Sequence, residues 1–222
     1  ISLSSSSYNI IANNILNTSS TALKLISGSG YNVFDNNTVL YSSLHAIEFR
    51  SNCFVTCQYP NNTNLTNNNF NNVEGYDLYL ADEDIHETYL TDQIITNYSI
   101  ENAIINFKET NVGEIGFLQA INGTGTNLSL DIQISSNLIE VNSSKTGLNK
   151  SADLSFYNIN LTSLGIIRPG PYRDGSSCSG DICTSFNNIS DNYYFRVNQF
   201  TNYSIGTNNS AAEAQNVTLT SS

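Results

Sequence analysis

Five side chains in the N-terminal half carry acid or base groups that a carbohydrate-cleaving enzyme could use: Asp35, His45, Asp82, Asp84 and His86. Glycoside hydrolysis requires two carboxyl groups on one face, and proton abstraction beside a uronate requires a base with neighbouring Lys or Arg. Asp35 and Asp82 do not occupy matching positions of the sequence repeat, and basic residues are scarce in this half. The sequence therefore predicts no catalytic site and a protein that is not an enzyme.

An acidic segment, Asp82-Glu83-Asp84, is the one candidate for a cofactor site. Carboxylate oxygens on a loop are ligands that Ca²⁺ prefers, so Asp82 and Asp84 are candidate calcium ligands. The alternative is a solvated acidic turn that protects a strand edge from aggregation. The segment lacks the full spacing of a calcium-binding loop, and both interpretations stay open.

Acceptor sites for N-linked glycans are frequent. The chain contains 14 Asn-x-Ser/Thr sequons, where its composition gives roughly 8 by chance. This excess favours a glycosylated, extracellular chain displayed at the cell surface. The sequons begin at Asn17, Asn36, Asn61, Asn64, Asn97, Asn122, Asn127, Asn142, Asn149, Asn160, Asn188, Asn202, Asn208 and Asn216.

The four cysteines form two close pairs, Cys53 with Cys57 and Cys178 with Cys183. Close pairs in a chain rich in sequons favour two local disulfides. The competing interpretation is a zinc site made of four thiolates. The spacings are not those of zinc knuckles, and no further ligand clusters near either pair.

Charge and hydropathy exclude two classes of partner. The net charge is −11, with 19 acidic and 8 basic residues, so the chain lacks the basic surface that nucleic-acid binding requires. The sequence contains no membrane-spanning run and no signal peptide. Because the sequence opens at Ile1 without a starting Met, we expect a processed piece of a longer exported protein.

The elements that must position these residues are coils of a sequence repeat. The segment 8–16 (YNIIANNIL) returns as 31–39 (YNVFDNNTV), an offset of 23 residues. Periods of this length are typical of solenoids. We therefore expect an all-β fold that begins with a right-handed parallel β-helix of about four coils.

Each coil contains an apolar residue, two variable positions, Asn, one further position and a second apolar residue. Inward apolar residues would stack in rows, while Asn tolerates the left-handed backbone of sharp turns and can pair in ladders. Asn13, Asn36 and Asn68 are the predicted ladder, and Gln93 marks a degenerate fourth copy. The alternative is that these Asn residues form surface turns without stacking.

An insertion interrupts the repeat between its second and third copies. The spacing from Asn36 to Asn68 is 32 residues, and the additional residues match Ser51 to Asn62. Insertions in solenoids extend from one face, which is often the binding face. Tyr59, Tyr76 and Tyr79 lie around this insertion and could stack on sugar rings, although Tyr is also common in strands.

After about Glu109 the period is lost and short strand-like runs follow one another, which predicts a β-sandwich. The predicted domains are the β-helix at 1–109, the sandwich at 110–207 and a polar tail or linker at 208–222. The predicted strands are Phe117–Ile121, Leu128–Ile134, Leu138–Val141, Ala152–Tyr157, Leu164–Ile167, Tyr193–Val197 and Tyr203–Ile205.

Four motifs in the second part carry a family resemblance: 148–157 (LNKSADLSFY), 173–178 (RDGSSC), 181–183 (DIC) and 195–204 (FRVNQFTNYS). In this order they resemble the β-sandwich module that follows parallel β-helix repeats in archaeal cell-surface glycoproteins. The resemblance spans residues 126–206, and the upstream repeats are similar to those of the same proteins. It implies export, surface display, a structural or adhesive role and a bridge between Cys178 and Cys183.

The expected function is that of a non-catalytic structural protein in a cell-surface layer (S-layer), sheath or filament. The sandwich would cover one end of the β-helix, and the open end near Ile1 would either continue the β-helix or pair with a neighbouring copy of the chain. One alternative is a surface adhesin or carbohydrate-binding module. A second, ranked last, is a β-helix enzyme that degrades polysaccharides.

Overall fold

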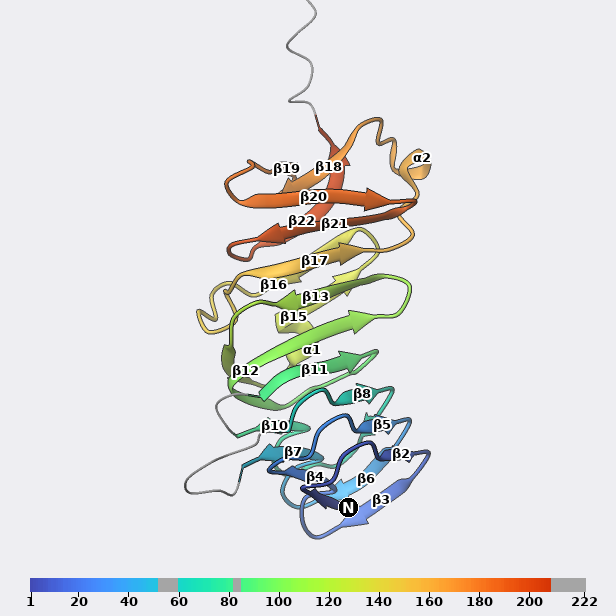
Figure 1. The fold of residues 1–222 in the computed structure, drawn as a ribbon, viewed down its shortest axis with the longest axis vertical. Coiled ribbons are helices and arrows are strands. Elements are labelled where there is room, and N and C mark those ends of the chain that lie inside the picture. Colours follow the sequence, from blue (N-terminus) through green and yellow to red (C-terminus); the bar gives the residue numbers. More distant parts are fainter. Residues whose placement is uncertain (52–59, 82–84, 209–222) are drawn as a thin grey trace, which may run out of the picture.

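The computed structural model describes residues 1–51, 60–81 and 85–208. The fold is mostly β, with 52% of the residues in strands and 4% in helices. Figure 1 shows an elongated molecule in which the strands lie across the long axis, from β1 and β2 at one end to β18 and β19 near the other.

Twelve strands make up the part of the chain where the repeat occurs. They are β1 (Ser2–Ser4), β2 (Ile10–Ala12), β3 (Ile15–Thr18), β4 (Leu23–Ile26), β5 (Val33–Asp35), β6 (Thr38–Ser42), β7 (Ile47–Arg50), β8 (Asn64–Thr66), β9 (Asn69–Phe70), β10 (Leu78–Leu80), β11 (Ile85–Thr91) and β12 (Tyr98–Glu109).

The rest of the described chain adds ten strands and two short helices. They are β13 (Gly113–Phe117), β14 (Ile121–Gly125), α1 (Leu128–Asp131), β15 (Ile132–Ser135), β16 (Leu138–Val141), β17 (Ala152–Phe156), α2 (Leu161–Leu164), β18 (Pro169–Arg173), β19 (Ser176–Ser177), β20 (Cys183–Ile189), β21 (Asn192–Val197) and β22 (Asn202–Thr207).

Nine parallel strands form a curled sheet shaped like half of a barrel. Their order is β1-β4-β7-β10-β12-β11-β8-β5-β2, while β3, β6 and β9 form a separate parallel sheet. Strands one repeat apart are direct neighbours: Ile10 pairs with Val33, and Leu16 pairs with Val39. The 23-residue offset in the sequence is therefore the spacing between hydrogen-bonded strands.

Apolar residues line up across these parallel strands because paired positions share one face of a sheet. One row runs through Leu3, Leu25, Phe49, Leu80 and Ile100. Its inner members Leu25, Phe49 and Leu80 are fully buried. A second row runs from β2 to β12 and shares one buried cluster with the first. The third row, across β3, β6 and β9, belongs to a smaller separate cluster, and Leu16 and Phe70 pack against both clusters.

The corners between strands need a left-handed backbone. Asn13, Asn36, Asn67 and Asp92 occupy one corner of successive repeats with φ of 59°, 50°, 51° and 50°. Asn and Asp tolerate this conformation better than other non-glycine residues. The repeats are thus 23, 31 and 25 residues long, as the hydrogen bonds between equivalent residues also indicate.

The expected spacing of 32 residues is therefore wrong by one, because Asn67 rather than Asn68 occupies the corner. The additional residues of this repeat fall between the end of β7 at Arg50 and the start of β8 at Asn64, the segment that the sequence indicates as an insertion. Cys53, Cys57 and Tyr59 lie in this segment, outside the described residues.

The predicted ladder of Asn13, Asn36 and Asn68 combines residues of two neighbouring columns. Asn36 Nδ2 donates to Asn13 Oδ1 at 2.7 Å, but Asn68 Oδ1 accepts from Asn37 Nδ2 at 3.0 Å. The buried column is Asn14, Asn37 and Asn68, one residue after each corner. Sequence alone did not distinguish the two columns because the corner residue and the ladder residue are both Asn.

Gln93 continues the buried column, as its position in the degenerate fourth copy indicates. With its amide oriented to accept, the side-chain oxygen of Gln93 lies 2.8 Å from the backbone nitrogen of Asn68. Each rung satisfies backbone groups of the rung below, since Asn37 Nδ2 donates to the carbonyl of Ile11 at 2.8 Å. The rungs of the polar column are thus hydrogen-bonded to one another from Asn14 to Gln93, as buried amides require.

Strand β12 joins the parallel and antiparallel parts of the molecule. Its first residues pair with β10 on one side and β14 on the other, and its later residues pair with β11 and β13. The 14-stranded sheet therefore continues across residue 109, where the sequence predicts a domain boundary. Figure 1 shows β12 lying between the short parallel strands and the longer antiparallel ones.

Beyond β12, antiparallel strands form two groups. The order β13-β17-β21-β20 extends the large sheet, and β15-β16-β22-β18-β19 forms a second one. Aromatic rings of the two groups meet: the centroid of Phe195 in β21 lies 6.0 Å from that of Tyr203 in β22. Both side chains are buried, so the hydrophobic core continues from the repeats into this part.

The predicted boundaries of these later strands are wrong in several places. Phe117–Ile121 is not one strand, because it covers the turn between the end of β13 and the start of β14. Leu164–Ile167 is not a strand, because helix α2 and its left-handed C-cap Gly165 occupy this region. Leu128–Ile134 begins as helix α1, capped by the side chain of Asn127, and only then becomes β15. Strands β18 and β20 were not predicted; β20 is mostly exposed and polar. The polar tail from residue 209 lies outside the described residues.

In the described part of the chain, no helix has the length and apolar composition that crossing a bilayer requires.

Candidate functional site

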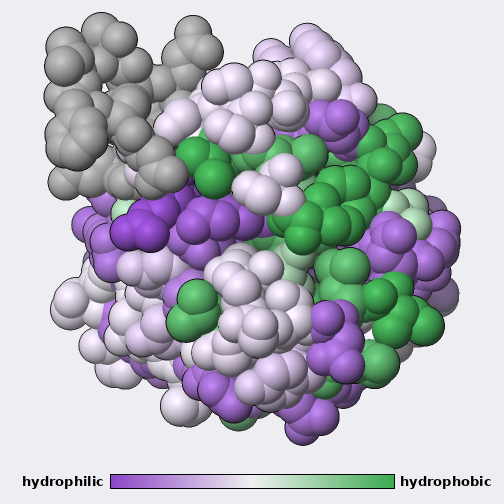
Figure 2. Space-filling model, turned by 90° about the horizontal axis from the view of Figure 1, so that it is seen from below, coloured by the Kyte–Doolittle hydropathy of each residue, from purple (hydrophilic) through white to green (hydrophobic). Residues whose placement is uncertain are grey.

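The end of the molecule that carries β1, β2 and β3 presents strand edges. Within the described chain these strands pair only with β4, β5 and β6, which leaves their outer edges without a neighbouring strand. Tyr8, Ile10 and Ile15 are 77%, 76% and 73% exposed on this end. Figure 2 views the end directly and shows hydrophobic residues gathered on it. We call this surface the open end.

The polar columns also finish at the open end. In the rungs above, each Asn oxygen accepts both a backbone and a side-chain hydrogen bond from the rung below, as Asn37 Oδ1 does from Asn14. Asn32 Oδ1 accepts the same two bonds from Asn9. Asn9 and Asn14 form the lowest rungs, and no described residue donates to their side-chain oxygens. The open end therefore offers acceptors in the geometry that binds a further coil.

A second candidate site lies on the flank of the repeats, beside the insertion. The rings of His45, Tyr76 and Tyr79 form a near-parallel cluster, with centroids of His45 and Tyr79 4.4 Å apart. His45 Nδ1 accepts a hydrogen bond from the backbone of Tyr76, and burial lowers the pKa of this imidazole. The hydrogen bond to Tyr76 thus fixes the His45 ring, against which the rings of Tyr76 and Tyr79 stack.

Charged residues adjoin this aromatic cluster. The carboxylate of Glu48 is buried and lies 3.0 Å from Lys24 Nζ and 3.6 Å from Arg50 Nη1. Thr21 donates a further hydrogen bond to the same carboxylate. A buried charge needs such partners, so these groups neutralise one another.

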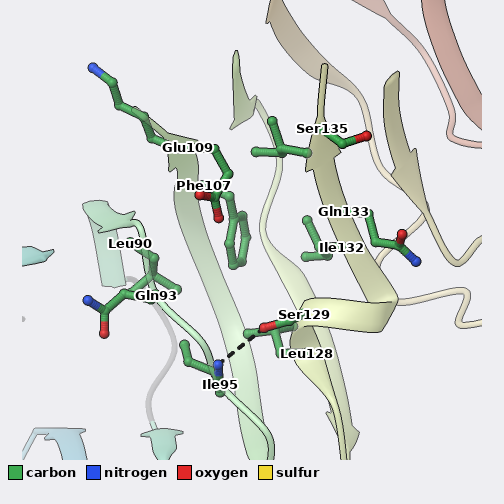
Figure 3. A pocket seen from close by; sticks show the side chains of 12 residues that line it. Leu90, Gln93, Ile95, Phe107, Glu109, Leu128, Ser129, Ile132, Gln133 and Ser135 are labelled. Atoms are coloured by element: carbon green, nitrogen blue, oxygen red, sulfur yellow. Dashed lines mark hydrogen bonds between the residues drawn. The ribbon is translucent and has the colours of Figure 1, made fainter. Parts of the chain in front are cut away.

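A cleft opens where β11 and β12 meet α1 and β15. Figure 3 shows Leu90, Ile95 and Phe107 on one side of it and Leu128 and Ile132 on the other. Its volume is about 200 Å³. The polar residues on its wall are Gln93, Lys108, Glu109, Ser129, Gln133 and Ser135.

Glu109 is the acidic group of this cleft. Burial, together with the negative charge and hydrogen bonding of Asp92, raises the pKa of its carboxyl from 4.5 to about 7. Asp92 is the left-handed corner residue of the last repeat, and its Oδ1 accepts from the backbone of Thr110 at 2.7 Å. The fold therefore places the carboxyl group of Glu109 in the wall of an apolar cleft, with Asp92 beside it but outside that wall, which the sequence did not indicate.

A buried polar network outside the cleft wall fixes helix α1, which contributes Leu128 and Ser129 to the cleft. Asp131, at the end of α1, lies 2.7 Å from Lys145 Nζ and accepts hydrogen bonds from Tyr98 and Asn142. These bonds tie α1 to β12 and to the loop after β16. Sequence reasoning missed this network because its members lie up to 47 residues apart.

The sequons differ in the exposure of the acceptor residue and in whether its side-chain nitrogen is hydrogen-bonded, as that of the exposed Asn36 is to Asn13. Asn17, Asn36, Asn122, Asn160 and Asn188 are exposed. By contrast, Asn97 Nδ2 donates to the carbonyl of Gly75 and Asn142 Nδ2 donates to Asp131. Asn216 lies outside the described residues. The acceptors of the remaining described sequons are partly buried: Asn61, Asn64, Asn127, Asn149, Asn202 and Asn208.

Cys178 and Cys183 form a disulfide, as their spacing predicts. Asp82 and Asp84 lie outside the described residues, so calcium binding there stays a prediction. Among the described residues no group of three or more His, Cys, Asp or Glu side chains is arranged as metal ligands. Asp35, His45 and His86 lie on β5, before β7 and on β11.

Comparisons with protein families, with curated proteins and with solved structures found no match to this chain. The function must therefore be argued from the geometry alone.

Proposed function

We propose that this chain is a non-catalytic structural segment of an exported, glycosylated surface protein, and that copies assemble through the open end. In this proposal the parallel strands form a right-handed β-helix, and the antiparallel strands beyond β12 form a β-sandwich that closes its other end. The surface assembly would be a layer, sheath or filament, as in the archaeal glycoproteins that the sequence resembles.

The hydrogen bonding between repeats supports a β-helix. Each repeat contributes one strand to each of three parallel stacks: β2, β3 and β4 are followed by β5, β6 and β7, and then by β8, β9 and β10. Left-handed corners at Asn13, Asn36 and Asn67 turn the chain between two of these stacks. Such corners and stacks are how a solenoid builds a continuous core from short strands.

The single observation that carries the proposed role is the composition of the open end. Edge strands with exposed apolar side chains promote pairing, and natural proteins protect such edges with charges, proline or a covering segment. Tyr8, Ile10 and Ile15 provide none of these protections, while Asn9 and Asn14 add hydrogen-bond acceptors. A neighbouring copy that pairs with these edges would bury both features.

Two further features support export. The disulfide between Cys178 and Cys183 is typical of an oxidising compartment. Sequons such as Asn17, Asn122 and Asn188 lie on strands with the asparagine exposed, as glycosylation requires. Extracellular localisation is the interpretation that accounts for both.

Electron micrographs of the protein isolated from its native cell surface test the proposed assembly. An ordered layer, sheath or fibre with this chain in its repeating unit is the expected result. Particles that stay single in native preparations, with no lattice or fibre, would exclude the structural role while leaving the β-helix fold intact.

A carbohydrate-binding adhesin is the alternative, and the cluster of His45, Tyr76 and Tyr79 favours it. Partly exposed aromatic rings provide apolar surface with polar tips, which suits the faces and hydroxyl groups of sugars. Binding to immobilised glycans that is lost in Tyr79→Ala, but retained in Tyr89→Ala, would support this function. Tyr89 is the matched control because it is exposed on β11, outside the cluster.

A further inference from the structure

We propose that the cleft between β12 and β15 binds a small organic cation that carries one apolar ring, with the carboxyl group of Glu109 receiving its charge. This proposal is independent of the structural role: the cleft lies at the junction with the antiparallel strands, on elements that do not form the open end.

Size and lining determine the apolar part of the ligand. The cleft measures about 200 Å³, and an apolar cavity of roughly 150 Å³ is known to hold a benzene ring. The side chains of Leu90, Ile95, Phe107, Leu128 and Ile132 are each largely buried yet line this space. A single ring with a short alkyl chain fits such a volume and lining.

Charge determines the polar part. Figure 3 shows the Glu109 carboxyl directed into the cleft beside Phe107. Asp92 reinforces its negative potential, and the whole chain carries a net charge of −11. A cation is therefore attracted, whereas an anion of the same shape is repelled. An ammonium group would also compete with the proton that Glu109, with a pKa of about 7, binds as the pH falls.

The other charged groups near Glu109 do not neutralise it. Lys108, its neighbour on β12, lies 4.0 Å from Glu114 of β13 and 6.0 Å from the ring centroid of Tyr157. The residues that α1 and β15 contribute to the cleft wall are uncharged, among them Ser129, Gln133 and Ser135. Of the residues that line the cleft, the one that can meet a ligand cation with a negative charge is thus Glu109.

Titration of the isotope-labelled chain with three probes of one shape tests this proposal: 2-phenylethylamine, 2-phenylethanol and 3-phenylpropionate. At pH 8 the amine should shift the amide resonances of the cleft residues and bind at least about fivefold more tightly than the alcohol. Because Glu109 titrates with a pKa of about 7, the amine affinity should rise up to about tenfold between pH 6 and pH 8.

Two variants separate the cleft from the acidic surface. Glu109→Gln should reduce the affinity for the amine to that of the alcohol and abolish its pH dependence. Glu140→Gln, which removes an exposed carboxylate from β16 outside the cleft wall, should leave both unchanged. Equal affinity for amine and alcohol, shifts spread over the acidic surface, or no shifts in the cleft at millimolar probe would each overturn the proposal.

Discussion

Two adjacent residues at each corner of the repeat perform different tasks. The first adopts the left-handed backbone, as Asn36 does, and the second provides the buried amide, as Asn37 does. The sequence predicted both tasks but assigned them to one column, because nothing in a run such as Asn67-Asn68-Asn69 marks which residue turns the chain. Only the partner in the neighbouring coil determines that register, and this partner is distant in sequence.

Removal of one buried rung should cost stability. Asn37→Ala leaves Asn14 without its acceptor and the carbonyl of Ile11 without its donor inside the fold. The expected loss is about 3 kcal/mol of unfolding free energy, since buried groups lose their partners. Urea unfolding measures it, with exposed Asn17→Ala as the control. A loss equal to that of the control would mean that the ladder contributes no stability.

The corner residue should respond to backbone conformation alone. Asn67 has φ of 51° and is exposed, so its side chain is not packed. Asn67→Gly should be tolerated, whereas Asn67→Ala should lower the unfolding free energy by about 1 kcal/mol because of its left-handed backbone. Thermal unfolding of the two variants makes the comparison. Identical midpoints would contradict a left-handed corner.

Glu109 should make the stability of the chain depend on pH. Its folded-state pKa of about 7 lies above the ordinary 4.5, so folding holds a proton that the unfolded chain releases. The carboxyl therefore lowers stability progressively as the pH rises through this interval. The free energy of unfolding of Glu109→Gln should equal that of the parent chain near pH 4 and exceed it at pH 8. A difference in unfolding free energy that grows as the pH falls would contradict this pH dependence.

Among the elements, β12 has the largest structural role, and the sequence predicted only its middle. Its alternating apolar residues predict a strand at Ala103–Phe107, but pairing with four neighbours extends the strand from Tyr98 to Glu109. Strand β20 was not predicted, because only Cys183 of its residues is buried and the strand shows no apolar alternation. Hydrogen bonding to β21, rather than burial, defines β20 as a strand.

Adjacent isoleucines on β12 test its role as the joining strand. Ile105 is fully buried, while Ile104 faces the other side and is only partly buried. Ile105→Ala should cost about 3 kcal/mol and Ile104→Ala clearly less, because a cavity forms only in the core. Hydrogen exchange should then show weaker protection in both β11 and β13. Protection lost on one side alone would mean that β12 does not couple the two parts.

At the scale of the whole molecule, the two ends differ. Antiparallel strands follow β12 at one end, whereas β1, β2 and β3 leave strand edges at the other. The 23-residue repeat predicted the parallel stacking of strands, because the offset between repeats can be measured in the sequence itself. The cleft and the place of Glu109 in its wall could not be predicted from the sequence, because they depend on how β15 and α1 pack against β12.

Assembly through the open end, as proposed, has a consequence for the number of copies. Two copies that meet through this end form an isologous, closed contact, so a dimer is the smallest expected product. A layer or filament then requires a second contact elsewhere on the molecule, and glycans on the flanks would restrict where it lies. The number of copies in solution is therefore the first quantity to establish.

Sedimentation velocity of the purified chain over a range of concentrations tests the open end most directly. We expect concentration-dependent dimerisation that is lost when Ile10 and Ile15 are both replaced by Lys. The matched control is Ile189→Lys, since Ile189 is 63% exposed on β20 at the opposite end. A chain that remains monomeric up to about 100 μM, or a dimer that persists in the Ile10 and Ile15 variant, would contradict assembly through this end.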